Sequence, residues 1–179
     1  MLRAKKYFLC EAFAFAVLFI PILGVNADVE VHENLSNLAF SVGEWVAEIE
    51  VESTAYRFEI SIQPAAAGHI LKGDLKVFAG SDLISQSTEI FYFKPESKKI
   101  SAISFNSSGR RFEGDFKKQG GKFVRKWVGI DENGKKISGE NHLEKIDRNS
   151  MIFRMTNIHR GRTKLPDQPV LKVRRIHPR

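Results

Sequence analysis

Residues 43–63 read GEWVAEIEVESTAYRFEISIQ, and this stretch decides the expected fold. Apolar and polar side chains alternate in two runs, the first through Trp45, Ala47 and Ile49 and the second through Phe58 and Ile60. Alternation with a period of two is typical of a β-strand that has one face in a core and one in water. The stretch therefore predicts two consecutive strands.

The same pattern continues to the end of the chain, interrupted by clusters of turn-forming residues such as Gly120-Gly121 and Asn133-Gly134. Further strands are expected over 71–77, 83–94, 99–106, 112–116, 123–130, 137–146, 151–159 and 170–176. In strand 83–94 the inward face is ambiguous, because Phe91 and Phe93 compete with Ile90 and Tyr92. The ten residues 160–169 are the longest expected loop, and only residues 30–40 are expected to form a short helix or turn.

About ten strands joined in order by short connections predict an all-β fold, an antiparallel up-and-down barrel, because closure removes the exposed sheet edges. A β-sandwich is the alternative, although sandwiches usually need longer crossovers between their sheets. The sequence shows no internal repeat and no linker, so we expect one domain over residues 28–179.

The first 27 residues have the layout of a secretory signal peptide. A basic start is followed by an apolar run over 12–23 and by small residues at Val25 and Ala27, which predicts cleavage after Ala27. A membrane anchor is the alternative, but Glu11 leaves the run short of the roughly 20 apolar residues of a spanning helix. We expect an exported protein, periplasmic or secreted, with no membrane span after cleavage.

Composition narrows the chemistry further. The only cysteine, Cys10, lies in the expected signal peptide, so the mature chain has neither disulfide nor thiolate metal site. A disulfide-free exported domain slightly favours a bacterial export compartment. The net charge is +7, but basic and acidic residues are mixed along the chain, which argues against a nucleic-acid-binding face. The sequence does not indicate an oligomeric state.

Gly43-Glu44-Trp45 at the start of the first strand resembles the opening motif of the lipocalin and calycin barrels. In that family the tryptophan closes the barrel bottom, and a basic residue of the last strand lies across its ring. The resemblance gives this role to Trp45 and, because Arg175 shares a face with Leu171 and Val173, to Arg175. The wider pattern is Leu-x-Phe-x-Val-Gly-x-Trp followed by strands and a basic pair near the end of the chain, and it resembles bacterial lipocalin-like domains of unknown function.

Arg125 is the sharpest candidate for ligand binding, because it alternates with Phe123 and Trp127. If this face is inward, Arg125 is a cation in an apolar cavity and needs an anion such as a ligand carboxylate. Fatty-acid-binding barrels resemble this arrangement. Two alternatives stay open: the face points outward, or Arg125 pairs with an internal acid such as Glu89.

Other candidates are weaker. Asn141, and also Asn157 and His159, fall on apolar faces where they could be polar contacts of a pocket. A divalent metal could use the row of Glu140, His142 and Glu144, but an exposed sheet face has the same pattern, so no metal or cofactor is expected. The sequence holds no nucleophile elbow, zinc-protease motif or phosphate loop, which makes an enzyme the minority interpretation and leaves no catalytic residues to name.

The leading hypothesis is a lipocalin-like barrel that binds a small, partly apolar molecule. In one version of this hypothesis the molecule is anionic, and Arg125 orients its acidic group. The expected wall residues are Phe58, Phe91, Phe123, Trp127, Phe153, Met155 and Asn141. The rival is a barrel filled by its own side chains that acts on partners or anionic surfaces through loops such as the basic segment 160–164. A barrel enzyme is the third possibility.

Overall fold

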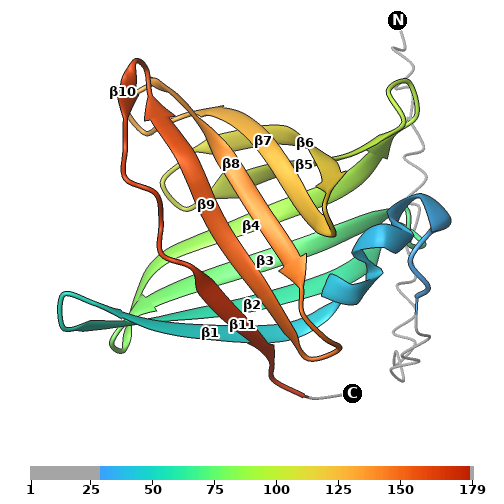
Figure 1. Ribbon diagram of the computed structural model, residues 1–179, viewed down its shortest axis with the longest axis horizontal. Coiled ribbons are helices and arrows are strands. Elements are labelled where there is room, and N and C mark those ends of the chain that lie inside the picture. The colour runs from blue at the N-terminus through green and yellow to red at the C-terminus, as the bar shows by residue number, and fades with distance from the viewer. Residues whose placement is uncertain (1–28, 178–179) are drawn as a thin grey trace, which may run out of the picture.

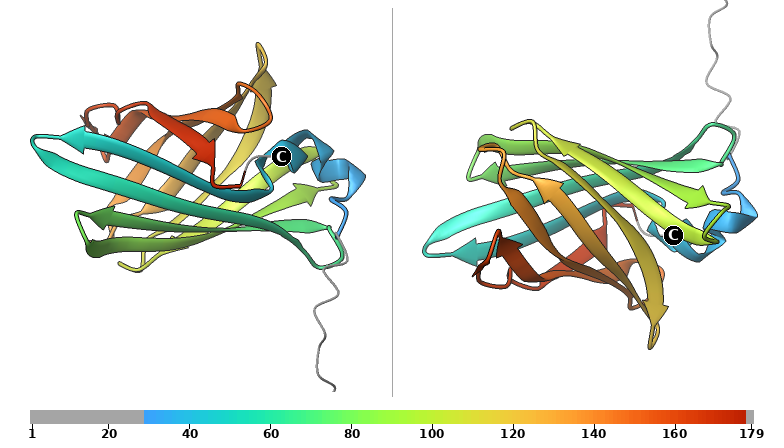
Figure 2. Two further views of the ribbon diagram at one scale, coloured as in Figure 1. Left: turned by 90° about the horizontal axis from the view of Figure 1, so that it is seen from below. Right: turned by 90° about the horizontal axis from the view of Figure 1, so that it is seen from above.

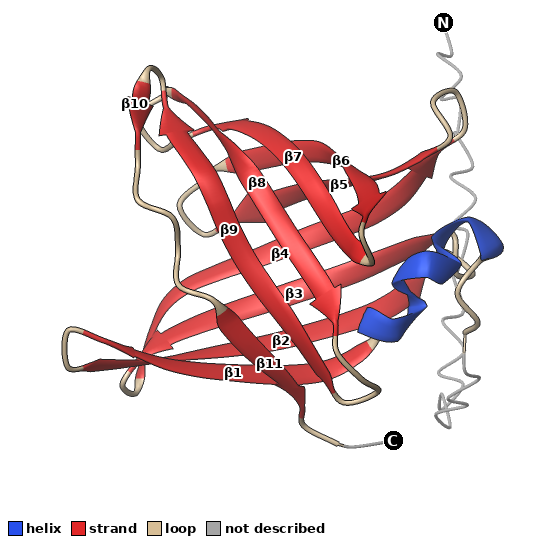
Figure 3. Ribbon diagram, viewed as in Figure 1, coloured by secondary structure: helices blue, strands red, loops and turns tan. Residues whose placement is uncertain are grey.

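Ten antiparallel strands close into a barrel in the computed structural model, which describes residues 29–177 (Figure 1). Figure 3 shows that strands make up most of the described chain and that one short helix stands at one end. The elements are η1 (Glu33–Ser41), β1 (Gly43–Val51), β2 (Thr54–Ala65), β3 (Ile70–Ala79), β4 (Asp82–Lys94), β5 (Lys99–Asn106), β6 (Arg111–Gln119), β7 (Lys122–Ile130), β8 (Lys136–Lys145), β9 (Ser150–Arg160), β10 (Thr163–Lys164) and β11 (Leu171–Arg175).

Neighbouring strands follow the chain order, as expected of an up-and-down meander. β1 to β8 pair in sequence, β8 pairs with β9, and β11 lies between β9 and β1 and completes the ring. The short β10 pairs only with β9 and stands outside the ring. The predicted barrel is confirmed, and the sandwich alternative is wrong because all the strands belong to a single sheet that closes on itself.

Local details differ from the expectations in two places. The helical segment is a 3-10 helix over Glu33–Ser41 rather than residues 30–40. The loop expected over residues 160–169 contains β10, which turns back onto the end of β9. The ambiguous strand is settled as well: Phe91 is buried in the same cluster as Phe93, so these phenylalanines face inward.

The segment expected to be a signal peptide, residues 1–27, lies outside the described residues. Within residues 29–177, no helix has the length and apolar character needed to cross a membrane.

Helix η1 lies across one end of the barrel, as the two further views in Figure 2 show. Its Leu35 and Leu38 side chains are completely or almost completely buried, and they contact Ile62, Leu71 and Phe91 on the inner wall. Full burial of a leucine side chain contributes about 1.5–3 kcal/mol. The helix therefore acts as an apolar plug for the end of the barrel at which β1 begins.

Gly43, Trp45 and Arg175 join the plug to the first and last strands. The Arg175 guanidinium carbon lies 4.0 Å from the centre of the Trp45 ring, and its Nη1 and Nη2 donate to the carbonyls of Val42 (2.7 Å) and Phe40 (3.1 Å). Trp45 donates its indole N–H to the Ser41 carbonyl at 2.8 Å. A Cβ on Gly43 would stand 2.1 Å from Arg175 Nη1, and the φ angle of Gly43 is +130°. Only glycine fits there, which explains the Gly-x-Trp motif physically.

We expect Arg175→Met to lower the free energy of unfolding by about 2–4 kcal/mol, because it removes a cation–π contact and the charged hydrogen bonds to the carbonyls of Phe40, Val42 and Arg148. Arg174→Met is the matched control. Arg174 faces solvent beside Glu48 at 3.7 Å, and exposed pairs contribute at most about 1 kcal/mol. Urea unfolding followed by tryptophan fluorescence measures both variants. Equal losses would show that Arg175 does not hold the plug.

Candidate binding site inside the barrel

Arg125 is a buried cation on the inner wall of the barrel. It lies on β7 between Phe123 and Trp127, and all three side chains are less than 10% exposed. The alternation expected from the sequence therefore points inward at this strand. Phe123 belongs to the apolar cluster under η1 and Trp127 to a second cluster with Ile137 and Ile158. Arg125 thus sits between two apolar regions.

Glu89 provides the counter-charge from across the interior. It lies on β4 in register with Gly73 and Ser104, and its Oε1 forms an ion pair with Arg125 Nη1. The structure thus realises the alternative in which Arg125 pairs with an internal acid. The guanidinium also lies over the Phe116 ring, with its central carbon 5.5 Å from the ring centre.

Two observations show that this pair is not fully satisfied by the protein. Arg125 Nε is buried and has no hydrogen-bond partner among the described residues. The Glu89 side chain remains 26% exposed although it faces inward, whereas that of Arg125 is 4% exposed. Buried donors almost always have an acceptor, from protein, water or ligand. At this point the barrel therefore has a buried N–H group without an acceptor beside a carboxylate that is only partly exposed.

The other expected wall residues all face inward but fall into three apolar clusters. Phe91 and Phe123 lie under η1, Phe58 and Phe153 pack around Trp45, and Met155 packs against Trp127. Asn141 lies opposite Arg125 in the β7–β8 register, and its Oδ1 accepts the indole N–H of Trp127 at 2.8 Å.

Three inner-wall residues next to the site were not predicted. Phe116 lies beneath Arg125, Phe112 meets the Trp127 ring edge-on with 5.1 Å between ring centres, and Ser104 lies opposite Glu89. The alternation of Phe112 and Phe116 along β6 was a usable signal. Ser104 becomes visible only through the strand register, because a serine in a strand carries no signal of its own.

A β-bulge overturns the interpretation of Asn157 and His159. Asn157 has a φ angle of +52°, and the β8–β9 register shifts between Ser138 and Glu140. One extra residue reverses the alternation beyond this point. Ile158 is therefore buried, while Asn157 is exposed and donates to Glu140 at 3.1 Å. Asn157 and His159 therefore do not line the barrel interior.

Glu140, His142 and Glu144 share the outer face of β8. They line an outer hollow of about 320 Å³ together with Lys122, Ile152, Arg154, Thr156, Asn157 and Asp167. Lysines pair with both acids, and His142 Nε2 lies 2.8 Å from the Thr156 hydroxyl and 3.7 Å from Glu140 Oε2. The Glu140 carboxylate and the Thr156 hydroxyl thus approach the same ring nitrogen of His142. In a catalytic triad the acid and the nucleophile contact opposite ring nitrogens, so this arrangement is not a triad. Within residues 29–177 no three histidine, cysteine or acidic side chains converge to hold a metal ion.

A second, more open hollow of about 480 Å³ lies at the β1–β2 hairpin. Its lining combines charged residues of the hairpin with half-buried Ile49 and Tyr56. It has no buried charge, so it offers less for specific recognition than the Arg125–Glu89 pair.

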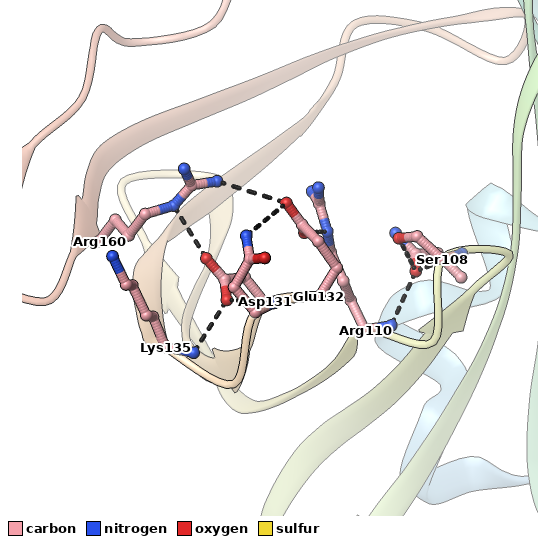
Figure 4. Close-up of polar contacts among 8 residues, drawn as sticks. Ser108, Arg110, Asp131, Glu132, Lys135 and Arg160 are labelled. Atoms are coloured by element: carbon pink, nitrogen blue, oxygen red, sulfur yellow. Dashed lines mark hydrogen bonds and ion pairs between the residues drawn. The ribbon is translucent and has the colours of Figure 1, made fainter.

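A charged cluster ties together three loops at the barrel end opposite η1 (Figure 4). The Asp131 side chain is completely buried, and its Oδ2 lies 3.0 Å from Arg160 Nε at the end of β9. Glu132 pairs with Arg110 and lies 4.0 Å from Arg160 Nη2. The backbone N–H groups of Asn133 and Lys135 donate to Asp131 Oδ1, both at 2.9 Å. We call these residues (Arg110, Asp131, Glu132 and Arg160) the rim cluster.

Comparison with known proteins adds support for the fold. No protein-family profile matches the chain, and no curated protein matches it in sequence. Among solved structures, the crystal structure of Rv2717c from M. tuberculosis is similar, with a TM-score of 0.59 and 12% identity. The match covers 83% of this chain and 100% of that chain. At this identity the similarity shows a shared barrel fold only.

We expect the rim cluster to make the fold sensitive to acid through Asp131. The Lys135 backbone N–H, followed by that of Asn133 and by the Arg160 charge, holds the pKa of Asp131 below its ordinary value of 3.8. A lowered folded-state pKa stabilises the fold above the unfolded-state pKa, and this stabilisation is lost as the pH falls through the folded-state value. Asp131→Asn should therefore be less stable than wild type at pH 7, and the difference should shrink as the pH falls below about 4.

Urea unfolding at a series of pH values measures this difference. Glu50→Gln, on the exposed side of β1, is the control and should give a small difference at every pH. A gap between wild type and Asp131→Asn that stays constant down to about pH 2 would contradict the assignment.

Proposed function

We propose that the protein is an exported, lipocalin-like barrel that binds a small, partly apolar molecule in its interior at Arg125. The observation that carries this proposal is the buried Arg125 Nε without an acceptor, beside an inward-facing and partly exposed Glu89. A ligand that brings an acceptor to this N–H and apolar surface to the surrounding aromatic rings satisfies both kinds of group.

The arrangement of charges supports binding over a purely structural role. Replacing a buried ion pair by apolar residues is often neutral or stabilising, so a barrel that needs only to fold has little use for a pair between two apolar clusters. A binding site does need such a group, because a few placed polar atoms fix the orientation of an otherwise apolar ligand.

The lipocalin-like part of the proposal is supported by the plug. The family resemblance gave Trp45 and Arg175 a contact at the barrel bottom, and these residues lie 4.0 Å apart, measured from the guanidinium carbon to the ring centre. The helix before β1 and the single closed sheet agree with the same architecture.

A second candidate function is an interaction module with a filled barrel. It is favoured by the three apolar clusters that occupy much of the interior and by the exposed basic residues Arg162 and Lys164 beyond β9. In that case, apolar probes should bind to outer surfaces rather than inside.

We expect the uncharged fluorescent probe N-phenyl-1-naphthylamine to bind at one saturable site, and Ser104→Phe to weaken this binding at least about tenfold. Ser104 faces inward opposite Glu89 and is 9% exposed, so a larger side chain there occupies the site. Phe105→Ser on the same strand is the matched control. Phe105 is 49% exposed on the outer face, and its replacement should leave affinity unchanged.

The reverse result, with loss in Phe105→Ser and none in Ser104→Phe, would place the probe on the outside and favour the filled barrel. Urea unfolding of both variants confirms that each is folded at the temperature of the titration.

Export predicts a defined N-terminus. The protein isolated from its own host should begin at Asp28, because the signal layout predicts cleavage after Ala27. N-terminal sequencing of the protein from the exported fraction measures this directly. A chain that retains residues 1–27 and remains in the cytoplasmic fraction would disprove export. Native mass spectrometry of the same material shows whether a small molecule is bound.

A further inference from the structure

The interior site is electrically neutral, and this limits the ligands it can accept. Three charged side chains are buried within residues 29–177: Arg125, Asp131 and Arg175. Asp131 pairs with Arg160 at the rim, and Arg175 is held by the carbonyls of the plug. Between the apolar clusters, Arg125 is the buried charge, and Glu89 already balances it.

A carboxylate ligand therefore meets opposing effects at this site. It could accept the free N–H of Arg125 Nε, but its charge would lie beside that of Glu89 in surroundings with little solvent. Like charges repel strongly under these conditions, since a reduced effective dielectric magnifies the interaction. An ammonium ligand would be attracted by Glu89 but repelled by the positive charge of Arg125.

An uncharged group that both accepts and donates a hydrogen bond meets neither penalty. Its acceptor can take the Arg125 Nε–H, and its donor can reach the carboxylate of Glu89, which is 26% exposed. Next to these two groups the wall is aromatic: Phe116 lies under the guanidinium, with the Phe91 ring centre 5.9 Å from its own. The remainder of the ligand therefore meets an apolar surface.

We propose that the ligand is an uncharged amphiphile whose polar end both donates and accepts a hydrogen bond, such as a primary amide or an alcohol, and that the Arg125–Glu89 pair discriminates against carboxylates. This inference rests on the proposed interior binding and names its ligand class. It replaces the anionic ligand that the sequence suggested from Arg125 alone.

Three probes of equal chain length test the inference: decanamide, decanoate and decylamine, each competing with N-phenyl-1-naphthylamine at pH 7.5. Decanamide should bind wild type at least tenfold more tightly than decanoate or decylamine. The net charge of +7 attracts the decanoate anion, so long-range electrostatics cannot explain a preference for decanamide over decanoate. Decanoate binding as tightly as decanamide would overturn the inference.

Glu89→Gln keeps the shape of the side chain and removes its charge. Decanoate should then gain at least tenfold in affinity relative to decanamide, because Arg125 is no longer neutralised. Glu113→Gln is the control for overall charge, since Glu113 lies near Lys94 on the outer face of the barrel. An unchanged ratio in folded Glu89→Gln would overturn the inference. If that variant does not fold, the order of the three probes in wild type decides alone.

The probe itself separates this inference from the function beneath it. If N-phenyl-1-naphthylamine fails to bind, or binds without regard to Ser104→Phe, interior binding is wrong and the ligand class falls with it. If the probe binds inside but decanoate displaces it best, interior binding stands and only the ligand class is wrong.

Discussion

Closure of the barrel depends on the short seam between β1 and β11. Only two residue pairs, Trp45 with Arg175 and Val46 with Arg174, are in register there, whereas β1 pairs with β2 along its whole length. A seam this short gains little from backbone hydrogen bonds. Arg175 compensates, because its guanidinium covers Trp45 and binds two carbonyls at the end of η1. One side chain thus connects the last strand, the first strand and the plug, in a chain whose only cysteine, Cys10, lies outside the described residues.

The plug and the interior ion pair use arginine in different ways. Arg175 donates to the carbonyls of Val42 and Phe40 and, through Nε, to that of Arg148 at 3.3 Å, so its three nitrogen donors all have partners. Arg125 forms an ion pair through Nη1 while its buried Nε has no acceptor among the described residues. A structural arginine is expected to satisfy its donors within the protein. The difference between the two residues is the physical reason to place binding at Arg125 and stability at Arg175.

Sequence reasoning was strongest where the relevant forces are local. Alternation along the chain predicted the strands, and the glycine and asparagine turns predicted their order, so the barrel followed. It could not predict the bulge at Asn157, because asparagine tolerates a positive φ angle without requiring it and nothing nearby marks the extra residue. The partner of Arg125 was also undetermined. β4 and β7 are separated by two strands, and the curvature of the sheet together with the strand registers decides that Glu89 meets Arg125.

The two ends of the barrel are held by different forces, and this bears on how a ligand would reach Arg125. Moving η1 would expose Leu35 and Leu38, which are 0% and 1% exposed, and would break the contacts of Arg175. Opening the opposite end breaks the rim cluster, where Asp131 is buried but Arg110, Glu132 and Arg160 are partly exposed. Water can solvate separated charges but cannot solvate exposed leucines favourably, so the rim opens against less resistance. Salt also weakens the more exposed Arg110–Glu132 pair, whereas it does not weaken the packing of the buried leucines of the plug. For the proposed interior binding, this difference favours the rim rather than η1 as the entrance.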